Sequence, residues 1–292
     1  MNKLSILCLT AAGLSSCTGN KTIQLKNKDT GNNSPRQLNI VILLTDDQGY
    51  GDMKCYGGEH LQTPNLDQLA AEGTRFTNFY AGAGASTPSR AALLTGRYAE
   101  RVGVPGVVDD TSKNGIKRDE ITLAEYLKQN DYATALIGKW HLGHTRKVHY
   151  PINRGFSHFY GHLNGAIDYF DHMREGELDW HNDWETCYDK GYSTELITQE
   201  AVRCINTYEK EGPFLLYVAY NAPHTPLQAQ EKDIELYCDD FGSLTPKEQK
   251  RVTYQAMVSC MDRGIGTIVD ALKKKGIMDN TFLIFFSDNG PA

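Results

Sequence analysis

Residues 38–45 read LNIVILLT and are followed directly by Asp46-Asp47-Gln48-Gly49. This continuous apolar run, rich in β-branched residues, is typical of a strand that is buried on both faces of a parallel sheet. Two carboxylates therefore stand at the carboxyl end of the strand, where open α/β sheets place their ligand sites. The segment predicts the fold class and one wall of a candidate site.

The rest of the chain alternates between strand patterns and helix patterns. Strands are expected at 75–81, 132–138, 214–220 and 281–287, and helices at 63–73, from about Ser86, and at 121–130, 195–210 and 249–275. The first of these helices has Thr63 as its expected N-cap, a proline in its first turn and a glycine after its end. This alternation indicates an α/β fold with a largely parallel central sheet flanked by helices.

Composition excludes several classes of protein. The 292 residues are 40% hydrophobic and 23% charged, which excludes a disordered chain, a collagen and a coiled coil. The 30 Lys and Arg against 36 Asp and Glu give a net charge of -6, so no nucleic-acid partner is expected. The 16 Tyr and 3 Trp suit a carbohydrate or aromatic ligand, but they equally suit an ordinary core.

The N-terminal segment has the pattern of a targeting signal. Residues 1–17 carry one lysine and an apolar stretch that is too short to span a bilayer, and Leu14-Ser15-Ser16-Cys17 resembles a bacterial lipobox. We expect 1–17 to be a lipoprotein signal peptide, with Cys17 lipidated, and polar residues 18–37 to be a flexible tether. This predicts a protein of the bacterial cell envelope, periplasmic or anchored to the outer membrane through its lipid. A plain signal peptide or a cytosolic N-terminus is the alternative.

Five cysteines follow the expected signal peptide. They are Cys55, Cys187, Cys204, Cys238 and Cys260. None stands in a CxxC spacing, so no zinc site is expected. Their odd number leaves at least one cysteine free or paired outside the chain.

Polar residues of a restricted kind stand at the ends of four apolar strands. They are Asp46 with Asp47, Lys139 with His141, His224, and Asp288 with Asn289. If the strands are parallel neighbours, these groups meet at one edge of the sheet. Three carboxylates and an amide oxygen form a hard oxygen set suited to Ca²⁺ or Mg²⁺. Each group alone is also a common turn or cap residue, but the repeated placement makes chance less plausible.

Residues 86–97 read STPSRAALLTGR, and this stretch resembles the sulfatase signature. In that signature a Cys or Ser is followed by x-Pro-Ser-Arg and, after three residues, by Leu-Thr-Gly-Arg. DDQG at 46–49, GKWHLG at 138–143, PHTP at 223–226 and DNG at 288–290 are similar, in order, to further sulfatase motifs. The resemblance covers about residues 39–290. Around 165–172 and 192–195 the chain looks most like arylsulfatase B, an N-acetylgalactosamine-4-sulfatase.

The resemblance implies an alkaline-phosphatase-like sandwich and a defined set of site residues. Ser86 would be oxidised to formylglycine by a separate maturation enzyme, and its hydrate would attack sulfur. The implied ligands of a Ca²⁺ or Mg²⁺ ion are Asp46, Asp47, Ser86, Asp288 and Asn289. The implied catalytic residues are Ser86, Arg90 and Lys139 as stabilisers of the hydrate and the sulfate, His224 as general acid and His141 as base. Asp168 and His172 could contact a sugar, although a polar pair in a loop explains them equally well.

The residues around Ser86 suit this chemistry. Ser86 is expected where a helix begins, so unpaired N–H groups and the helix dipole favour an anion there. A serine hydroxyl alone is a poor nucleophile without an adjacent base, whereas an aldehyde hydrate offers two geminal hydroxyls. Arg97 is expected to form a structural salt bridge. A further group is expected in loops and mostly facing solvent: His144, His149, His158 and His162.

Three functions remain open from the sequence. The first is a lipoprotein sulfatase acting on a sulfated glycan or aryl sulfate. The second is a phosphoryl hydrolase of the alkaline-phosphatase superfamily that uses unmodified Ser86. The third is an inactive, truncated sulfatase, because the family continues past the second metal-binding stretch with a sulfate-contacting lysine, further strands and a smaller C-terminal domain. For each of these functions the resemblance predicts that residues 38–292 are an incomplete N-terminal catalytic domain that lacks this C-terminal subdomain, poorly stable and weakly active at best.

Overall fold

A computed structural model describes residues 37–209 and 212–291 of the chain. The predicted signal peptide, its lipobox Cys17 and nearly all of the predicted tether lie outside the described residues. Among the helices described, none combines the length and the apolar character needed to cross a bilayer.

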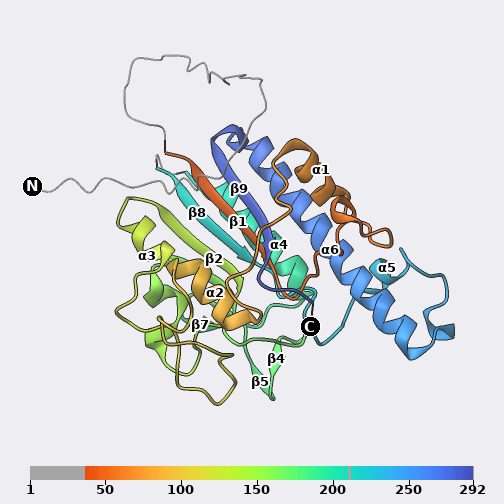
Figure 1. Ribbon diagram of the computed structural model, residues 1–292, viewed down its shortest axis with the longest axis horizontal. Helices are drawn as coiled ribbons and strands as arrows, with labels where there is room; N and C mark the ends of the chain where they lie inside the picture. Colours follow the sequence, from red (N-terminus) through yellow and green to blue (C-terminus); the bar gives the residue numbers. More distant parts are fainter. Residues whose placement is uncertain (1–36, 210–211, 292) are drawn as a thin grey trace, which may run out of the picture. The chain divides into compact units, whose positions relative to one another are not determined.

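The centre of the structure is a seven-stranded sheet with the order β7-β6-β3-β2-β8-β1-β9 (Figure 1). Its strands are β1 Asn39–Thr45, β2 Ala133–Lys139, β3 His158–His162, β6 His181–Asn182, β7 Glu185–Thr186, β8 Phe214–Ala219 and β9 Thr281–Ser287. The five longer strands pair in parallel, and β6 and β7 pair antiparallel at one edge. A separate hairpin joins β4 Met173–Arg174 to β5 Glu177–Leu178. The predicted, largely parallel α/β sheet is confirmed.

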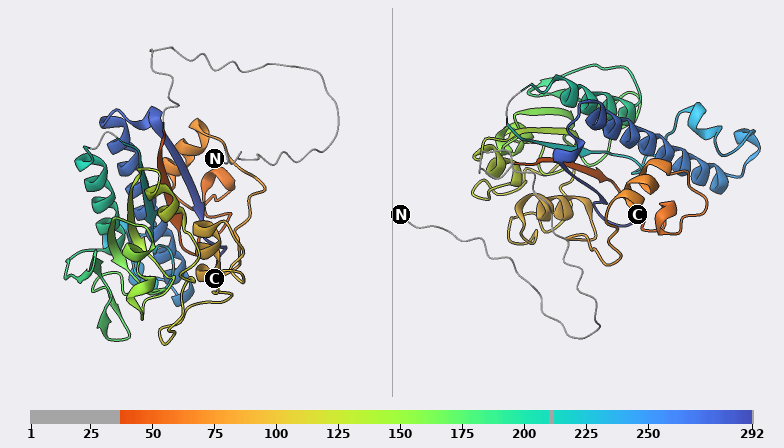
Figure 2. Two further views of the ribbon diagram at one scale, coloured as in Figure 1. Left: turned by 90° about the vertical axis from the view of Figure 1, so that its left-hand side faces the viewer. Right: turned by 90° about the horizontal axis from the view of Figure 1, so that it is seen from above.

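Helices cover both faces of this sheet (Figures 1 and 2). They are α1 Pro64–Glu72, α2 Ser86–Thr95, α3 Leu123–Lys128, α4 Ser193–Thr207, α5 Glu231–Ile234 and α6 Pro246–Lys274. Short 3-10 segments lie at Lys54–Tyr56, Lys147–His149, Pro151–Arg154, Phe241–Ser243 and Met278–Asn280. Helices α4 and α6 pack on one face, and α2 and α3 lie on the other.

The core is divided by the sheet because successive side chains of a strand point to opposite faces. Val41 and Leu43 of β1 belong to the cluster packed under α4 and α6. Ile42 and Leu44 belong to the cluster packed under α2 and α3. All four side chains are buried, which explains why the segment is apolar throughout instead of alternating.

The start of α1 differs from its predicted capping. Thr63 makes no side-chain cap, and its Oγ1 instead accepts a hydrogen bond from the Lys54 amide at 3.1 Å. Asp262 of α6 takes over this role, because its carboxylate accepts hydrogen bonds from the Asn65 amide at 3.1 Å and the Leu66 amide at 2.8 Å. The free N–H groups of a helix start are thus satisfied by a neighbouring helix.

Two further predictions of secondary structure fail. Residues 75–81 form bends instead of a strand, and Phe76 and Phe79 are exposed there. The prediction is wrong because the aromatic residues of this segment mimic a strand pattern without pairing to the sheet. Conversely, β3 was expected to be loop. Its sequence HFYGH carries histidines and a glycine, but pairing with β2 and β6 makes it a strand.

Candidate functional site

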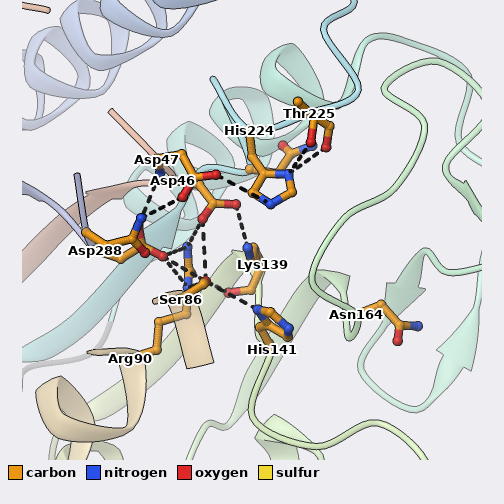
Figure 3. A network of polar contacts seen from close by, with 12 residues as sticks. Asp46, Asp47, Ser86, Arg90, Lys139, His141, Asn164, His224, Thr225 and Asp288 are labelled. Carbon is orange, nitrogen blue, oxygen red and sulfur yellow. Dashed lines mark hydrogen bonds and ion pairs between the residues drawn. The ribbon is translucent and has the colours of Figure 1, made fainter. Parts of the chain in front are cut away.

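The polar residues at the strand ends do converge (Figure 3). The segments that carry them follow β1, β2, β8 and β9, which are adjacent and parallel in the sheet. Helix α2 adds Ser86 and Arg90 from its first two turns. The residues that the structure brings together are Asp46, Asp47, Ser86, Arg90, Lys139, His141, His224, Asp288 and Asn289.

The Ser86 hydroxyl lies at the centre of this cluster. Ser86 is the first residue of α2 and is 8% exposed. Its Oγ is 2.8 Å from Asp288 Oδ2, 2.9 Å from Arg90 Nε and 3.2 Å from His141 Nδ1. A group at this position is therefore held by a carboxylate, a guanidinium and an imidazole.

Buried ion pairs surround the hydroxyl. Lys139 Nζ lies 2.5 Å from Asp46 Oδ2, and both side chains are fully buried. Arg90 reaches Asp46 at 3.3 Å and Asp288 at 2.8 Å. Burial raises the pKa of Asp46 to about 8 although Lys139 opposes this, whereas for Asp288 the charges of Arg90 and Lys139 outweigh burial and lower the pKa to about 2. A single charge of either sign would be costly at this depth, so the paired arrangement stabilises both.

A second group of oxygens fits a hard divalent cation. Carboxylate oxygens of Asp46, Asp47 and Asp288 lie within 4.8 Å of one another. The Asn289 amide donates from Nδ2 to Asp47 Oδ1 at 2.6 Å, while its buried Oδ1 has no hydrogen-bond partner among the described residues. An orphaned buried oxygen beside three carboxylates is a donor set that Ca²⁺ or Mg²⁺ would satisfy.

His141 is held in an uncommon backbone conformation. Its φ is 58°, in the left-handed region, as is that of Asp47 at 58°. Such backbone strain in residues other than glycine is concentrated at functional sites. The Val108 carbonyl, 3.2 Å from Nε2, can only accept a hydrogen bond, so the proton sits on Nε2 and Nδ1 faces Ser86 as an acceptor. Burial, with Lys139 and Arg90 nearby, lowers the pKa of His141 well below its usual value, which keeps the ring neutral.

His224 occupies a more open position. Its side chain is 25% exposed, and Nε2 lies 3.5 Å from Asp47 Oδ2. Nδ1 faces the carbonyl of Thr225 at 2.5 Å. Burial, followed by the charge of Lys139, lowers the pKa of His224 below its usual value. This histidine stands where a leaving group could reach solvent, in contrast to the enclosed His141.

Two predicted sugar-contacting residues are engaged within the fold. Asp168 accepts hydrogen bonds from the Phe170 amide at 2.8 Å and the Gln228 side chain at 2.6 Å. His172 is 1% exposed and stacks on Trp180 with ring centroids 4.5 Å apart. These contacts account for both residues without a ligand.

Of the two remaining expectations about polar residues, one is confirmed and one is wrong. Arg97 forms the expected ion pair, 2.6 Å from Glu120. The prediction that the four loop histidines mostly face solvent is wrong, because His158 and His162 lie in β3 and His162 is fully buried. The sheet, which the sequence did not reveal there, encloses them.

Sequence reasoning missed two residues that position His141. Val108 orients the ring through its main-chain carbonyl. Gly165 packs against the ring itself, where an added Cβ would lie 2.5 Å from the ring atoms Cε1 and Nε2. A carbonyl gives no sequence signal because every residue carries one, whereas the Gly at 165 was a signal that could have been read as close packing.

Comparisons with known proteins decide the family. The sequence profile of the family described as Sulfatase matches residues 38–292. The chain belongs to the sulfatase family. Arylsulfatase J of Mus musculus is 37% identical over 273 residues, covering 90% of this chain and 44% of that protein. N-acetylgalactosamine-6-sulfatase of Homo sapiens is 34% identical over 279 residues, covering 89% of this chain and 51% of that protein.

A solved structure agrees with the fold. The crystal structure of Ps i-CgsB in complex with k-i-k-neocarrahexaose has a TM-score of 0.80 and 36% identity, and it covers 87% of this chain and 59% of that one. The predicted alkaline-phosphatase-like sulfatase fold is thereby confirmed. This sulfatase chain spans about half the length of the curated relatives it matches. Its closer resemblance to arylsulfatase B stays a prediction.

Proposed function

We propose that this sulfatase hydrolyses a sulfate ester of a glycan or an aryl sulfate and releases inorganic sulfate. The observation that carries the proposal is the position of Ser86. Its Oγ lies within 3.2 Å of Asp288, Arg90 and His141, at the start of a helix and beside the cation-suited oxygens. A nucleophile beside the buried Arg90 guanidinium, at the start of a helix, suits attack on an anionic ester.

Two additions to the chain are part of this proposal. A Ca²⁺ or Mg²⁺ ion would be held by Asp46, Asp47, Asp288 and Asn289, with the group at Ser86 as a further ligand. When bound, the ion supplies positive charge to the sulfate and lowers the pKa of a nearby hydroxyl. Ser86 would first be converted to formylglycine by a maturation enzyme, which takes two electrons and two protons from the CH₂OH group and passes them to its own oxidant.

The chain's own residues have distinct proposed roles. Arg90 and Lys139 balance the charge of the sulfate and of the hydroxyl at position 86. His224, on the open side, protonates the departing oxygen, and His141 accepts a proton at Nδ1 from the hydroxyl it faces. Loss of one electrostatic stabiliser typically costs ~10²–10³ in rate, and loss of a general acid ~10²–10⁴.

The substrate class rests on the relatives. Two of them are named for sulfate esters of aryl groups or N-acetylgalactosamine, and one was solved with a neocarrahexaose. These names support a sulfated sugar as substrate. The lipobox motif supports an envelope location, with a lipid on Cys17 as the membrane contact. Globomycin-sensitive processing and palmitate labelling of wild type, but not of Cys17→Ala, would test that location.

The decisive experiment joins mass spectrometry with assays. The peptide containing residue 86 should be lighter by two hydrogens after expression with a maturation enzyme. Free sulfate should be released from a panel of N-acetylgalactosamine, galactose and aryl sulfates. Ser86→Ala should abolish release, whereas the matched control Ser243→Ala, on an exposed 3-10 segment, should retain it. Activity on phosphate esters alone with unmodified Ser86 would overturn the proposal in favour of a phosphoryl hydrolase.

A further inference from the structure

A second group of metal-ligating side chains lies at the amino end of strand β3, whereas Ser86 lies at the carboxyl ends of the parallel strands. His158 is the first residue of β3, whereas the residues around Ser86 follow the carboxyl ends of parallel strands. Glu200 and Cys204 face His158 from α4. One ligand atom from each of the three residues lies within 4.8 Å of the others. The cluster therefore has no part in the proposed sulfatase chemistry.

The three side chains converge because of local geometry. Glu200 and Cys204 are four residues apart in a helix, so their side chains share one face. Glu200 Oε1 lies 2.6 Å from His158 Nε2 and 3.8 Å from Cys204 Sγ. Imidazole, thiolate and carboxylate are the ligand types that zinc takes in tetrahedral sites.

Neighbouring residues orient two of the three ligands. Asp183 Oδ1 lies 3.0 Å from His158 Nδ1 and also accepts a hydrogen bond from the Phe159 amide at 2.9 Å. A histidine that ligates a metal through one nitrogen commonly donates its other N–H to a carboxylate in this way. Arg203 donates to both carboxylate oxygens of Glu200, from Nε to Oε2 at 2.6 Å and from Nη2 to Oε1 at 2.5 Å, and so fixes the orientation of the carboxylate. A cation bound at Oε1 would displace the Nη2 contact and leave Arg203 on Oε2.

A cavity adjoins the cluster and leaves space for a fourth ligand. Its volume is about 250 Å³, and its lining includes His158, Cys204 and Arg203. That volume accommodates several water molecules. A tetrahedral ion bound by three side chains could complete its coordination with water from this side.

We propose that the chain binds one Zn²⁺ ion, or a similar thiophilic divalent cation, through His158 Nε2, the Glu200 carboxylate and the Cys204 thiolate, with water as the fourth ligand. The ion would link the amino end of β3 to α4, away from Ser86. The alternative is a network of hydrogen bonds and ion pairs among the same residues, without a metal. The absence of a CxxC spacing does not bear on this site, because its ligands come from a strand and a helix.

Cobalt distinguishes the two possibilities, because a thiolate ligand gives Co²⁺ a charge-transfer band in the near ultraviolet. The full chain, stripped of metal under reducing conditions, is titrated with Co²⁺. We expect the band to saturate at one equivalent and Zn²⁺ to abolish it. The oxygen ligands around Ser86 contribute no such band, so the result is independent of sulfatase activity.

Substitutions identify which cysteine thiolate gives the charge-transfer band. Cys204→Ser should remove it, whereas the matched control Cys238→Ser, on another half-buried cysteine, should leave it unchanged. Asp183→Asn, which alters only a positioning residue, should weaken Co²⁺ binding ~10–100-fold. Circular dichroism establishes that each variant is folded. A wild type without the band, or a band that persists in Cys204→Ser, would overturn the proposal.

Discussion

Lys139 offers a direct test of the electrostatics around Ser86. Its Nζ lies 2.5 Å from Asp46 Oδ2, and both side chains are fully buried. Lys139→Met removes the charge and retains most of the side-chain length. Asp46 then keeps only Arg90, at 3.3 Å, as a cationic partner. Breaking a buried pair typically costs about 3–5 kcal/mol, because one charge is left without compensation.

The structure favours the lower end of that range. Burial already raises the pKa of Asp46 to about 8, and losing Lys139 raises it further. Below that pH the carboxyl is therefore held in its neutral form, and the cost of an uncompensated buried charge is partly avoided. We therefore expect the free energy of unfolding to fall by about 3 kcal/mol in the absence of divalent cations. Against a typical total of about 5–15 kcal/mol, the variant should still fold.

Calcium should reverse part of this loss. A cation bound at the proposed site would share the charge of the Asp46 carboxylate with Lys139, so removing Lys139 is expected to tighten Ca²⁺ binding. Urea unfolding with EDTA and with saturating Ca²⁺ measures both effects through the transition midpoint and slope. Lys250→Met, an exposed lysine on α6, is the matched control and should change neither. A loss under about 1 kcal/mol in EDTA, or weaker Ca²⁺ binding in the variant, would refute the reasoning.

Three further substitutions test how the fold supports the site. Gly138→Ala should destabilise by at least about 2 kcal/mol, because φ is +111° and the new Cβ would lie 2.0 Å from the Ala219 carbonyl oxygen; a urea midpoint equal to that of wild type would contradict this. For Asp179, burial raises the pKa, but hydrogen bonds, from His181 first, lower it to about 2 from 3.8. Its stabilisation is therefore full above pH 3.8 and lost as the pH falls through 2, so the unfolding free energies of wild type and Asp179→Asn should converge by about 2 kcal/mol between these pH values. Arg154→Leu should cost about 3 kcal/mol or more, since this buried guanidinium donates to three main-chain carbonyls of the loop before α3; thermal unfolding at an unchanged temperature would exclude that role.

The sequence predicted the strands that are apolar throughout. β1, β2, β8 and β9 are apolar runs, although β9 is only half-buried at the edge of the sheet, and parallel pairing alone then places the residues after them at one end of the strands. Strand β3 was not predicted because its sequence, HFYGH, has no apolar run. Its burial depends on pairing with β2 and β6, which come from other parts of the chain. Residues 75–81 failed in the opposite sense, since aromatic residues can signal a strand where no partner strand is available.

The sequence motifs identify which residue types form the site, whereas tertiary packing determines their protonation and hydrogen bonding. The signature and the strand ends identify Ser86, His141 and Asn289 as residue types. The tautomer of His141 depends on the Val108 carbonyl, and the free Oδ1 of Asn289 depends on the direction its Nδ2 takes toward Asp47. Both are consequences of tertiary packing, which a motif cannot encode. Searches by cysteine spacing share this limit, since a strand and a helix can bring ligands together at any separation along the chain.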